Sequence, residues 1–378
     1  MMKVPKGKTV LVKGVASIKG ECEVLGARLN FFECEKFVPV FCIEDCEIEI
    51  NGEFRILDGS TIPESWKKLA KMDWETVFLY GGVDSGKSTL AAYLANKVGG
   101  AYVLDLDIGQ ADIANPGAMG YGFAKDVVSL SKVSMINGFF VGSITPQGRE
   151  AKCLQGVARL WKELRRLDGR KIVDTTGWVK GRGAKEYKLA KLEIIEPDLI
   201  ASFEGKPFDW KTFEVEKGYV IRRDKIDRAK ARFESYQKFL RGARILELER
   251  DRINLKPDLF RGKDVTQFIE SVLGVKVVFA RLGENHLAIC TKEDCNPDYV
   301  ILKELKELYE VDDIFLFSEG EARNFVAGLY REKKYIGIGL IKGINDRISL
   351  ESAQSEFDTI EIGEIRLEGG RECFIKRF

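Results

Sequence analysis

One uninterrupted stretch constrains the fold of this chain more than any other: residues 77–94, VFLYGGVDSGKSTLAAYL. It reads as an apolar strand, then a glycine-rich loop, then a helix. Residues 81–88, GGVDSGKS, match the pattern G-x-x-x-x-G-K-[ST] without a mismatch. A strand, loop and helix of this kind predict a parallel sheet covered by helices, with a phosphate group bound where the helix begins.

The residues of this phosphate loop (residues 81–88) have distinct expected tasks. Successive backbone N–H groups surround phosphate oxygens, and the start of the helix adds a positive dipole. Lys87 is expected to reach the β- and γ-phosphates, and Ser88 is expected to ligate Mg²⁺, so ATP and Mg²⁺ are the predicted cofactors. The predicted nucleotide-binding residues are Gly81, Gly82, Val83, Asp84, Ser85, Gly86, Lys87, Ser88 and Thr89. The loop alone leaves open whether the γ-phosphate goes to water, goes to another molecule or stays in place.

The rest of the chain predicts an α/β fold in three parts. Residues 1–70 alternate like short strands and predict an all-β domain. Residues 71–255 alternate strands with helices and predict a central P-loop NTPase domain with a parallel sheet, including a late helix at about 224–241. Residues 256–378 predict a β-rich domain with one helix, at about 298–310.

Charge and composition exclude some classes of function. The net charge is +1 and the chain contains a single histidine, so an enzyme here needs a general base other than imidazole. A net charge near zero also argues against a protein that coats nucleic acid over its whole surface. Two stretches are nevertheless basic: residues 149–191 hold 13 lysines and arginines against five acidic residues, and residues 217–244 hold ten against three. Such stretches either contact a polyanion or form solvated helix faces.

No stretch reads as a signal peptide or as a membrane span. The first 20 residues interrupt their apolar runs with lysine and glycine, and no run approaches the ~18 apolar residues that a spanning helix requires. We therefore expect a soluble, cytoplasmic protein without a membrane partner.

The eight cysteines are expected to be reduced thiols rather than zinc ligands. Cys42 and Cys46 lie in FCIEDCEIEI, which alternates like one strand and would place them ~13 Å apart, too far for a disulfide. Cys290 and Cys295 form a loop pair that could form a disulfide.

Acidic residues follow two of the predicted strands of the central domain. Asp105 and Asp107 end the strand AYVLDLD, and on a continuing strand they would point the same way. In a parallel sheet this end of the strand faces the bound nucleotide, so a metal ion or an acceptor hydroxyl would lie between the two carboxylates. Asp105 is the predicted metal ligand beside Ser88. Asp174, at the end of KIVDTT, is a second candidate for the metal-side acid, and the alternative is that strand-end aspartates are merely solvated.

Two further segments suggest a second substrate. Trp178, in TTGW, is either a core residue or a ring on which a nucleobase stacks. A later helix is expected to have an apolar face formed by Ile226, Phe233 and Tyr236. Arg228 and Arg232 are expected to lie together on another face of that helix. Those arginines either pair internally or stabilise the charge of a phosphoryl group in transfer.

In this order, the motifs resemble the polynucleotide 5′-hydroxyl kinase family, which includes the kinase subunit of the eukaryotic pre-mRNA cleavage factor, ribosomal-RNA-processing kinases and archaeal relatives. The resemblance covers most of the chain. It is carried by the phosphate loop, by DxDxGQ at residues 105–110 followed by PGAMG, by TxGW at 175–178, and by the pair Arg223 and Arg228. The short form without long extensions is similar to archaeal members.

The resemblance implies a role for each matching residue. Asp107 accepts the proton of the 5′-hydroxyl, and Arg223 and Arg228 close over the phosphates as a lid pair. The clasp loop (residues 175–178) holds the terminal nucleotide. The residues implied to contact the acceptor are Trp178, Thr175, Gly177 and Gln110. The implied acceptor is RNA or DNA with a 5′-hydroxyl end, and RNA-processing proteins are possible partners.

Two other functions fit the same motifs. One is an ATP-binding scaffold of an RNA-processing assembly without turnover. The other is a P-loop switch ATPase or GTPase, although such proteins generally lack the clasp loop and the lid pair. The presence of every residue that the resemblance implies for catalysis favours the kinase.

Overall fold

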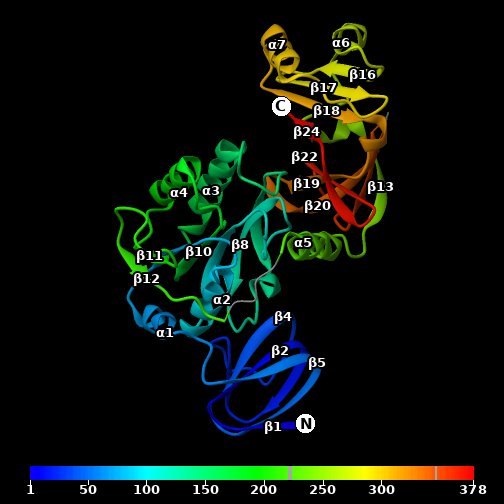
Figure 1. Cartoon of the computed structure of the whole chain (residues 1–378). Coiled ribbons are helices and arrows are strands. Elements are labelled where there is room, and N and C mark those ends of the chain that lie inside the picture. The colour runs from blue at the N-terminus through cyan, green and yellow to red at the C-terminus, as the bar shows by residue number, and fades with distance from the viewer. Residues whose placement is uncertain (220–223, 345–346) are drawn as a thin grey trace. The chain divides into compact units, whose positions relative to one another are not determined.

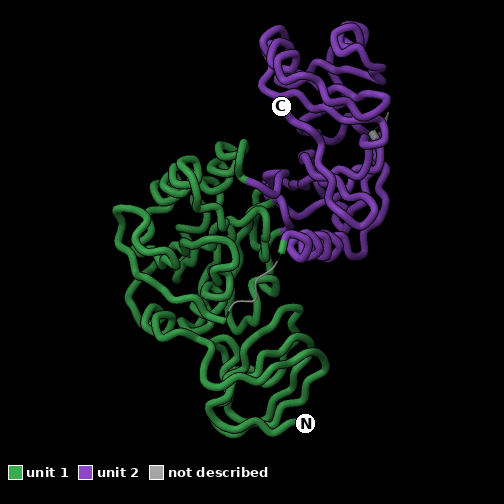
Figure 2. The backbone as a smooth tube through the Cα atoms, viewed as in Figure 1, with its two compact units in different colours: residues 1–114, 118–139, 146–224 green, residues 115–117, 140–145, 225–378 purple. Residues whose placement is uncertain are grey.

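The computed structural model describes residues 1–219, 224–344 and 347–378. The chain forms two compact units, which Figure 2 colours separately. The first comprises residues 1–114, 118–139 and 146–224, and the second comprises residues 115–117, 140–145 and 225–378. The predicted domain boundaries at residues 70 and 255 are defined by sequence pattern rather than by compactness, and they stay predictions.

The first unit begins with a five-stranded sheet in the order β1-β5-β2-β4-β3, as the alternating pattern predicted. Its strands are β1 (Met2–Val4), β2 (Lys8–Lys19), β3 (Cys22–Val24), β4 (Phe31–Cys42) and β5 (Cys46–Asp58). All its pairings are antiparallel, and the long strands β2, β4 and β5 form most of the sheet (Figure 1).

The expectation that Cys42 and Cys46 lie on one strand was wrong, whereas the expectation that they form no disulfide is confirmed. The stretch that contains them is not one strand: β4 ends at Cys42, residues 43–45 turn, and β5 begins at Cys46. The two thiols are hydrogen-bonded to each other, and burial raises the pKa of Cys42 to about 12. Alternation continued through the turn, so the sequence pattern did not reveal it. All eight cysteines are free thiols in the structure.

The first unit continues with a seven-stranded sheet in the order β12-β11-β6-β10-β7-β8-β9. Its strands are β6 (Thr76–Tyr80), β7 (Ala101–Leu106), β8 (Ala118–Ala124), β9 (Met135–Phe140), β10 (Lys171–Thr175), β11 (Leu199–Ser202) and β12 (Thr212–Glu214). The five strands from β12 to β7 are parallel, as predicted. The strand β8 pairs antiparallel with β7, because the loop between them reverses the chain without a covering helix. This antiparallel pairing was not predicted.

Four helices accompany this sheet: α1 (Glu64–Lys71), α2 (Lys87–Lys97), α3 (Glu150–Leu164) and α4 (Arg182–Ile195). The helix α2 packs against β7 and β10, while α3 packs against α4 (Figure 1). The helix α4 was not predicted. None of the described helices is both long and apolar enough to span a membrane.

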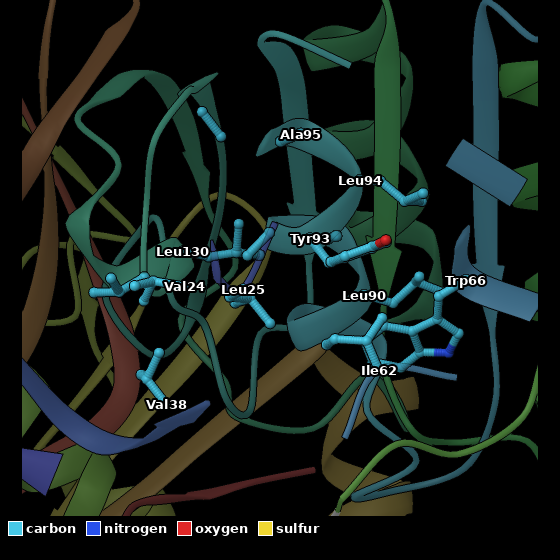
Figure 3. Close-up of a cluster of buried hydrophobic side chains, with 14 of the residues drawn as sticks. Val24, Leu25, Val38, Ile62, Trp66, Leu90, Tyr93, Leu94, Ala95 and Leu130 are labelled. Atoms are coloured by element: carbon cyan, nitrogen blue, oxygen red, sulfur yellow. The ribbon is translucent and has the colours of Figure 1, made fainter. Parts of the chain in front are cut away.

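The two sheets of the first unit share one hydrophobic core. Val24, Leu25 and Val38 of the N-terminal sheet belong to the same buried cluster as Leu90 and Tyr93 of α2. Figure 3 shows these side chains around α2. The N-terminal sheet is therefore packed against the helix that begins at the phosphate loop.

The second unit contains two further sheets. One has the order β13-β21-β20-β19-β22-β14, with β23 paired to β22, and the other has the order β15-β16-β17-β18-β24. The strands are β13 (Arg244–Glu249), β14 (Asn254–Lys256), β15 (Lys263–Asp264), β16 (Val277–Leu282), β17 (His286–Thr291), β18 (Asp313–Ser318), β19 (Phe325–Arg331), β20 (Lys334–Ile344), β21 (Arg347–Ser352), β22 (Thr359–Glu368), β23 (Arg371–Phe374) and β24 (Lys376–Arg377). The helices are α5 (Lys225–Phe239), α6 (Thr266–Leu273) and α7 (Tyr299–Tyr309), of which α6 was not predicted.

Two short segments between β7 and α3 are part of this second unit. The hydroxyl of Tyr335 donates to Asn115 Oδ1, and the backbone N–H of Phe140 donates to the hydroxyl of Tyr330 at 3.0 Å. Tyr335 is fully buried, and its ring stacks on that of Phe140 with centroids 6.3 Å apart. The second unit is thus completed by pieces of chain that come from the P-loop region.

Candidate active site

The phosphate loop connects β6 to α2. Gly86 has a φ of +101°, which a residue with a side chain rarely adopts, so glycine is required where the loop enters the helix. Lys87 is nearly buried, and its Nζ donates to the carbonyl oxygens of Gly81 and Gly82 at 2.9 and 2.8 Å. The ammonium group therefore lies on the inner side of the loop, where Lys87 was predicted to meet phosphate oxygens.

A residue that the sequence did not indicate also holds this loop. Glu204, two residues beyond β11, accepts a hydrogen bond from the backbone N–H of Gly82 through Oε1 at 2.7 Å. A Cβ at position 82 would lie 2.8 Å from that oxygen, so a side chain there would push the carboxylate out of this position. The available signal is its place at the carboxyl end of the strand next to β6. No motif marks it.

Asp105 is buried and uses both carboxylate oxygens to fold the loop after β7. Oδ1 accepts from the backbone N–H of Asp107 at 3.0 Å, and Oδ2 accepts from those of Asp112 and Ile113 at 2.7 and 3.1 Å. Burial and the neighbouring carboxylate of Asp174 raise the pKa of Asp105 well above its usual range. The predicted metal ligand is therefore already engaged by three backbone amides.

Asp107 is placed differently from Asp105, because β7 ends at Leu106. Its Oδ1 accepts from the backbone N–H groups of Gly109 and Gln110, both at 3.1 Å. The expectation that Asp105 and Asp107 extend one strand and point the same way was wrong, since the chain turns between them. The side-chain amide of Gln110 donates to the carbonyl oxygen of Gly109 at 2.8 Å, so this loop is held by its own polar groups.

Asp174 lies next to Asp105, in register on the neighbouring strand β10. Burial raises its pKa to about 6, against the lowering effects of Lys87 and of a hydrogen bond from Ser88. Within the part of the chain that the structure describes, its Oδ1 is buried without a hydrogen-bond partner. A buried carboxylate oxygen without a partner is costly unless a ligand completes it. Of the aspartates at these strand ends, Asp174 is the one adjacent to the phosphate loop's Lys87 and Ser88.

The clasp loop follows Asp174 directly. Thr175 is fully buried, and its hydroxyl donates to the carbonyl oxygen of Leu79 at 2.8 Å. A Cβ at Gly177 would lie 2.6 Å from the backbone nitrogen of Val83, so this glycine lets the clasp loop touch the phosphate loop. Trp178 is partly exposed, and its ring lies 5.7 Å from that of Tyr187. The structure thus brings together the phosphate loop and the clasp loop.

The helix α4 brings two buried lysines to this region that the sequence did not indicate. Lys188 Nζ donates to Thr175 Oγ1 at 2.7 Å and to the carbonyl oxygen of Thr176 at 2.6 Å. Lys191 lies 4.1 Å above the ring of Tyr187, and burial lowers its pKa to about 8. Lysine is normally a surface residue, so both positions look solvated in the sequence. Their three-residue spacing, in phase with apolar residues, was the only signal.

The lid pair is described only in part. Arg223 lies outside the described residues. Arg228 lies in the first turn of α5, in the second unit, whereas the phosphate loop belongs to the first unit. The expectation for the faces of α5 was wrong at its start, because Ile226 is 77% exposed. Arg232 is bound to Glu372 of β23 through Nε at 2.8 Å and Nη2 at 2.6 Å, which removes it as a free phosphate ligand.

The central region of the chain matches a known protein family. Residues 81–247 match the family model of the mRNA cleavage and polyadenylation factor CLP1 P-loop. This region is similar to the CLP1 P-loop family. The match begins at Gly81 and ends within β13, so it covers the phosphate loop, both strand-end aspartates, the clasp loop and the lid pair.

Two archaeal kinases are similar in sequence to most of this chain. The polyribonucleotide 5′-hydroxyl-kinase of Pyrococcus furiosus is 28% identical over 327 residues, which cover 79% of this chain and 90% of the relative. The corresponding protein of Methanocaldococcus jannaschii is 26% identical over 336 residues, covering 81% of this chain and 88% of the relative. The resemblance to the polynucleotide 5′-hydroxyl kinase family is confirmed.

Solved structures of the CLP1 type share the fold. A Clp1p chain in complex with Pcf11p superposes with a TM-score of 0.66 at 13% identity, covering 97% of each chain. A second Clp1p–Pcf11p structure gives a TM-score of 0.63 at 11% identity. At such low identity these likenesses establish the α/β fold with flanking β-rich parts. The roles of individual residues stay predictions.

Proposed function

We propose that this chain is an ATP-dependent kinase that transfers the γ-phosphate of ATP to the 5′-hydroxyl of RNA. The observation that carries the proposal is the arrangement of three adjacent strands. The ends of β6, β10 and β7 carry, in that order, the phosphate loop, the clasp loop and Asp107. A donor site, an acceptor site and a base therefore meet at one edge of one sheet.

The reaction needs little covalent chemistry from the protein. The bond between the γ-phosphorus and the ADP oxygen breaks, and a bond from the 5′-oxygen to that phosphorus forms. Asp107 takes the hydroxyl proton: its Oδ1 is anchored by two backbone N–H groups, and the anchoring orients the carboxylate. Lys87 neutralises charge on the phosphates. Positioning and charge neutralisation supply most of the rate acceleration in this class of reaction.

The donor set fits Mg²⁺. Asp174 is the metal-side acid in this proposal, in place of Asp105, because its Oδ1 is buried without a partner and its neighbour is Ser88. A hard cation prefers carboxylate and hydroxyl oxygens of this kind. When bound, it neutralises charge on the phosphate oxygens. Asp105 shapes the loop that carries Asp107.

The remaining predicted residues complete the acceptor side and the lid. Trp178 stacks the terminal base, and Gln110, which follows the carboxyl end of the neighbouring strand β7, is a further contact. Arg223 and Arg228 stabilise the transferring phosphoryl group. RNA is the proposed acceptor because the archaeal relatives are named polyribonucleotide kinases. An RNA-processing protein is a proposed partner because the related Clp1p chains are in complex with Pcf11p.

The test is transfer of a labelled γ-phosphate. The protein is incubated with Mg²⁺, γ-labelled ATP and a 5′-hydroxyl oligoribonucleotide, in parallel with the same oligonucleotide carrying a 5′-phosphate. Label on the first substrate alone is the expected result. ATP binding without label on either would overturn the kinase in favour of an ATP-binding scaffold. Phosphate release that ignores the oligonucleotide would instead identify a P-loop switch ATPase.

The base is tested with Asp107→Asn, which keeps the shape of the side chain and one acceptor oxygen. We expect transfer to fall by about 10³-fold, within the range of general base catalysis, while ATP binding is retained. Full transfer by this variant would sink the assignment. An oligodeoxyribonucleotide of the same sequence measures the preference for RNA.

A further inference from the structure

Lys188 is a fully buried lysine beside the clasp loop that the proposed reaction does not use. It has no exposed surface, and its Nζ donates to Thr175 Oγ1 at 2.7 Å and to the carbonyl oxygen of Thr176 at 2.6 Å. Burying a lysine is costly unless its donors are satisfied. Both of these partners belong to the clasp loop, so the position of this loop determines where the lysine is held.

The hydrogen bonds continue from the clasp loop into the phosphate loop. The hydroxyl of Thr175 accepts from Lys188 and donates to the carbonyl oxygen of Leu79 at 2.8 Å. Leu79 is the penultimate residue of β6, two residues before the phosphate loop begins at Gly81. A single hydroxyl therefore links the lysine of α4 to the strand that carries the phosphate loop.

A second contact joins the same two loops. The backbone of Gly177 approaches that of Val83 so closely that a Cβ on the glycine would lie 2.6 Å from the Val83 nitrogen. Packed backbones cannot move independently at this distance. The clasp loop and the phosphate loop are therefore connected both through Thr175 and by direct contact.

We propose that Lys188 is a positioning residue that couples the two substrate sites. A bound nucleotide then strengthens the binding of the 5′ end of the acceptor, and a bound 5′ end strengthens the binding of the nucleotide. This inference rests on the proposed kinase function, which assigns the phosphate loop to the donor and the clasp loop to the acceptor. The coupling is reciprocal by thermodynamic necessity, and it can be measured from either side.

The same helix offers a matched control. Lys191 lies one turn further along α4, is also fully buried, and within the described residues its Nζ has no hydrogen-bond partner. Lys191→Met therefore removes a buried ammonium group from α4 without removing a bond to the clasp loop. Lys188→Met removes a buried ammonium group together with both bonds.

The experiment measures the affinity of a non-hydrolysable ATP analogue by calorimetry, with and without a saturating 5′-hydroxyl oligoribonucleotide. For the natural protein and for Lys191→Met we expect the oligonucleotide to tighten analogue binding by a factor of about ten, within the range of coupled sites. For Lys188→Met the factor should fall to about one, while binding of the analogue alone stays nearly unchanged. A tenfold factor retained in Lys188→Met would overturn the proposal.

Two further variants keep the test decisive if Lys188→Met folds poorly. Thr175→Val removes the linking hydroxyl and should also lose the coupling, whereas Thr175→Ser keeps the hydroxyl and should preserve it. The double variant Lys188→Met/Thr175→Val should be no worse than either single variant, because all three break one connection. Additive losses would instead indicate two unrelated structural effects and would contradict the proposal.

The two proposals fail in distinguishable ways. If the natural protein does not transfer phosphate to the 5′-hydroxyl, the kinase function is wrong. If it transfers phosphate and Lys188→Met keeps the coupling, only the role of Lys188 is wrong. The steady-state constants give the same distinction, since lost coupling raises the KM for the oligonucleotide measured at saturating ATP.

Discussion

The carboxyl ends of β7 and β10 carry the same residue type at the same depth, yet they use it differently. Asp105 and Asp174 are register partners on neighbouring strands, and both are buried. Asp105 gives both oxygens to backbone N–H groups of its own loop. Asp174 keeps one oxygen without a partner among the described residues. A buried acid can thus either fold a loop or remain available to a ligand, and only its hydrogen bonds tell which.

The strongest way to test this difference is Asp174→Asn. The amide keeps the shape but removes the negative charge beside Lys87 and Ser88, so we expect the kcat for phosphate transfer to fall by about 10³-fold. The free energy of unfolding should change little or rise, because the neighbouring carboxylate of Asp105 loses a like charge. Steady-state kinetics and urea unfolding measure the two effects. Unchanged kcat would place the metal-side acid elsewhere.

The matching variant on β7 is Asp105→Ala. It leaves three backbone N–H groups without their acceptor, so we expect the free energy of unfolding to fall by about 4 kcal/mol. Asp105→Asn keeps one acceptor oxygen and should lose less. Chemical denaturation measures both. A stable Asp105→Ala protein with transfer abolished would reverse the roles assigned to Asp105 and Asp174.

The buried lysine Lys191 tests how positive charge is tolerated near these acids. Its pKa is about 8 in the folded chain against 10.5 when exposed, because burial disfavours the ammonium form. The folded state is therefore destabilised at every pH below about 8, and this penalty disappears as the pH rises towards 10.5. Lys191→Met should raise the free energy of unfolding by about 3 kcal/mol at pH 7. The gain should vanish near pH 10.5, as urea titrations at several pH values would measure, and a pH-independent gain would contradict the assignment.

The smallest expected effect concerns the rim of the clasp loop. Trp178→Ala removes one stacking surface, worth about 1–3 kcal/mol, so the KM for the oligonucleotide should rise by about tenfold or more. The KM for ATP should change much less. Equal effects on both constants would make Trp178 a packing residue against Tyr187 rather than a contact of the acceptor.

The parts of the site that lie within one contiguous stretch of sequence could be predicted, whereas the parts that depend on contacts between separate stretches could not. The phosphate loop is contiguous, so the strand, loop and helix around Gly81–Ser88 were predicted correctly. The sequence offered both Asp105 and Asp174 as the metal-side acid and left the choice open, because that choice depends on which backbone N–H groups turn back towards β7.

The same reasoning explains the helices and turns that were missed. The helix α4 carries Lys188 and Lys191 on its buried side, which hides its apolar face. The turn between Cys42 and Cys46 preserves the alternation of the strands on either side. In each case tertiary contacts overrode the local pattern.

Residues 115–117 and 140–145, which belong to the second unit, limit where this protein can be truncated. Asn115 and Phe140 find partners on Tyr335 and Tyr330, more than 180 positions later in the chain. A truncation that ends near residue 224 would strip those partners from the P-loop region and leave the Phe140 N–H unsatisfied. Limited proteolysis should therefore fail to release a folded catalytic fragment. Insertions into this chain are therefore better placed at its exposed turns than near residues 224–225, where the first unit ends and most of the second unit begins.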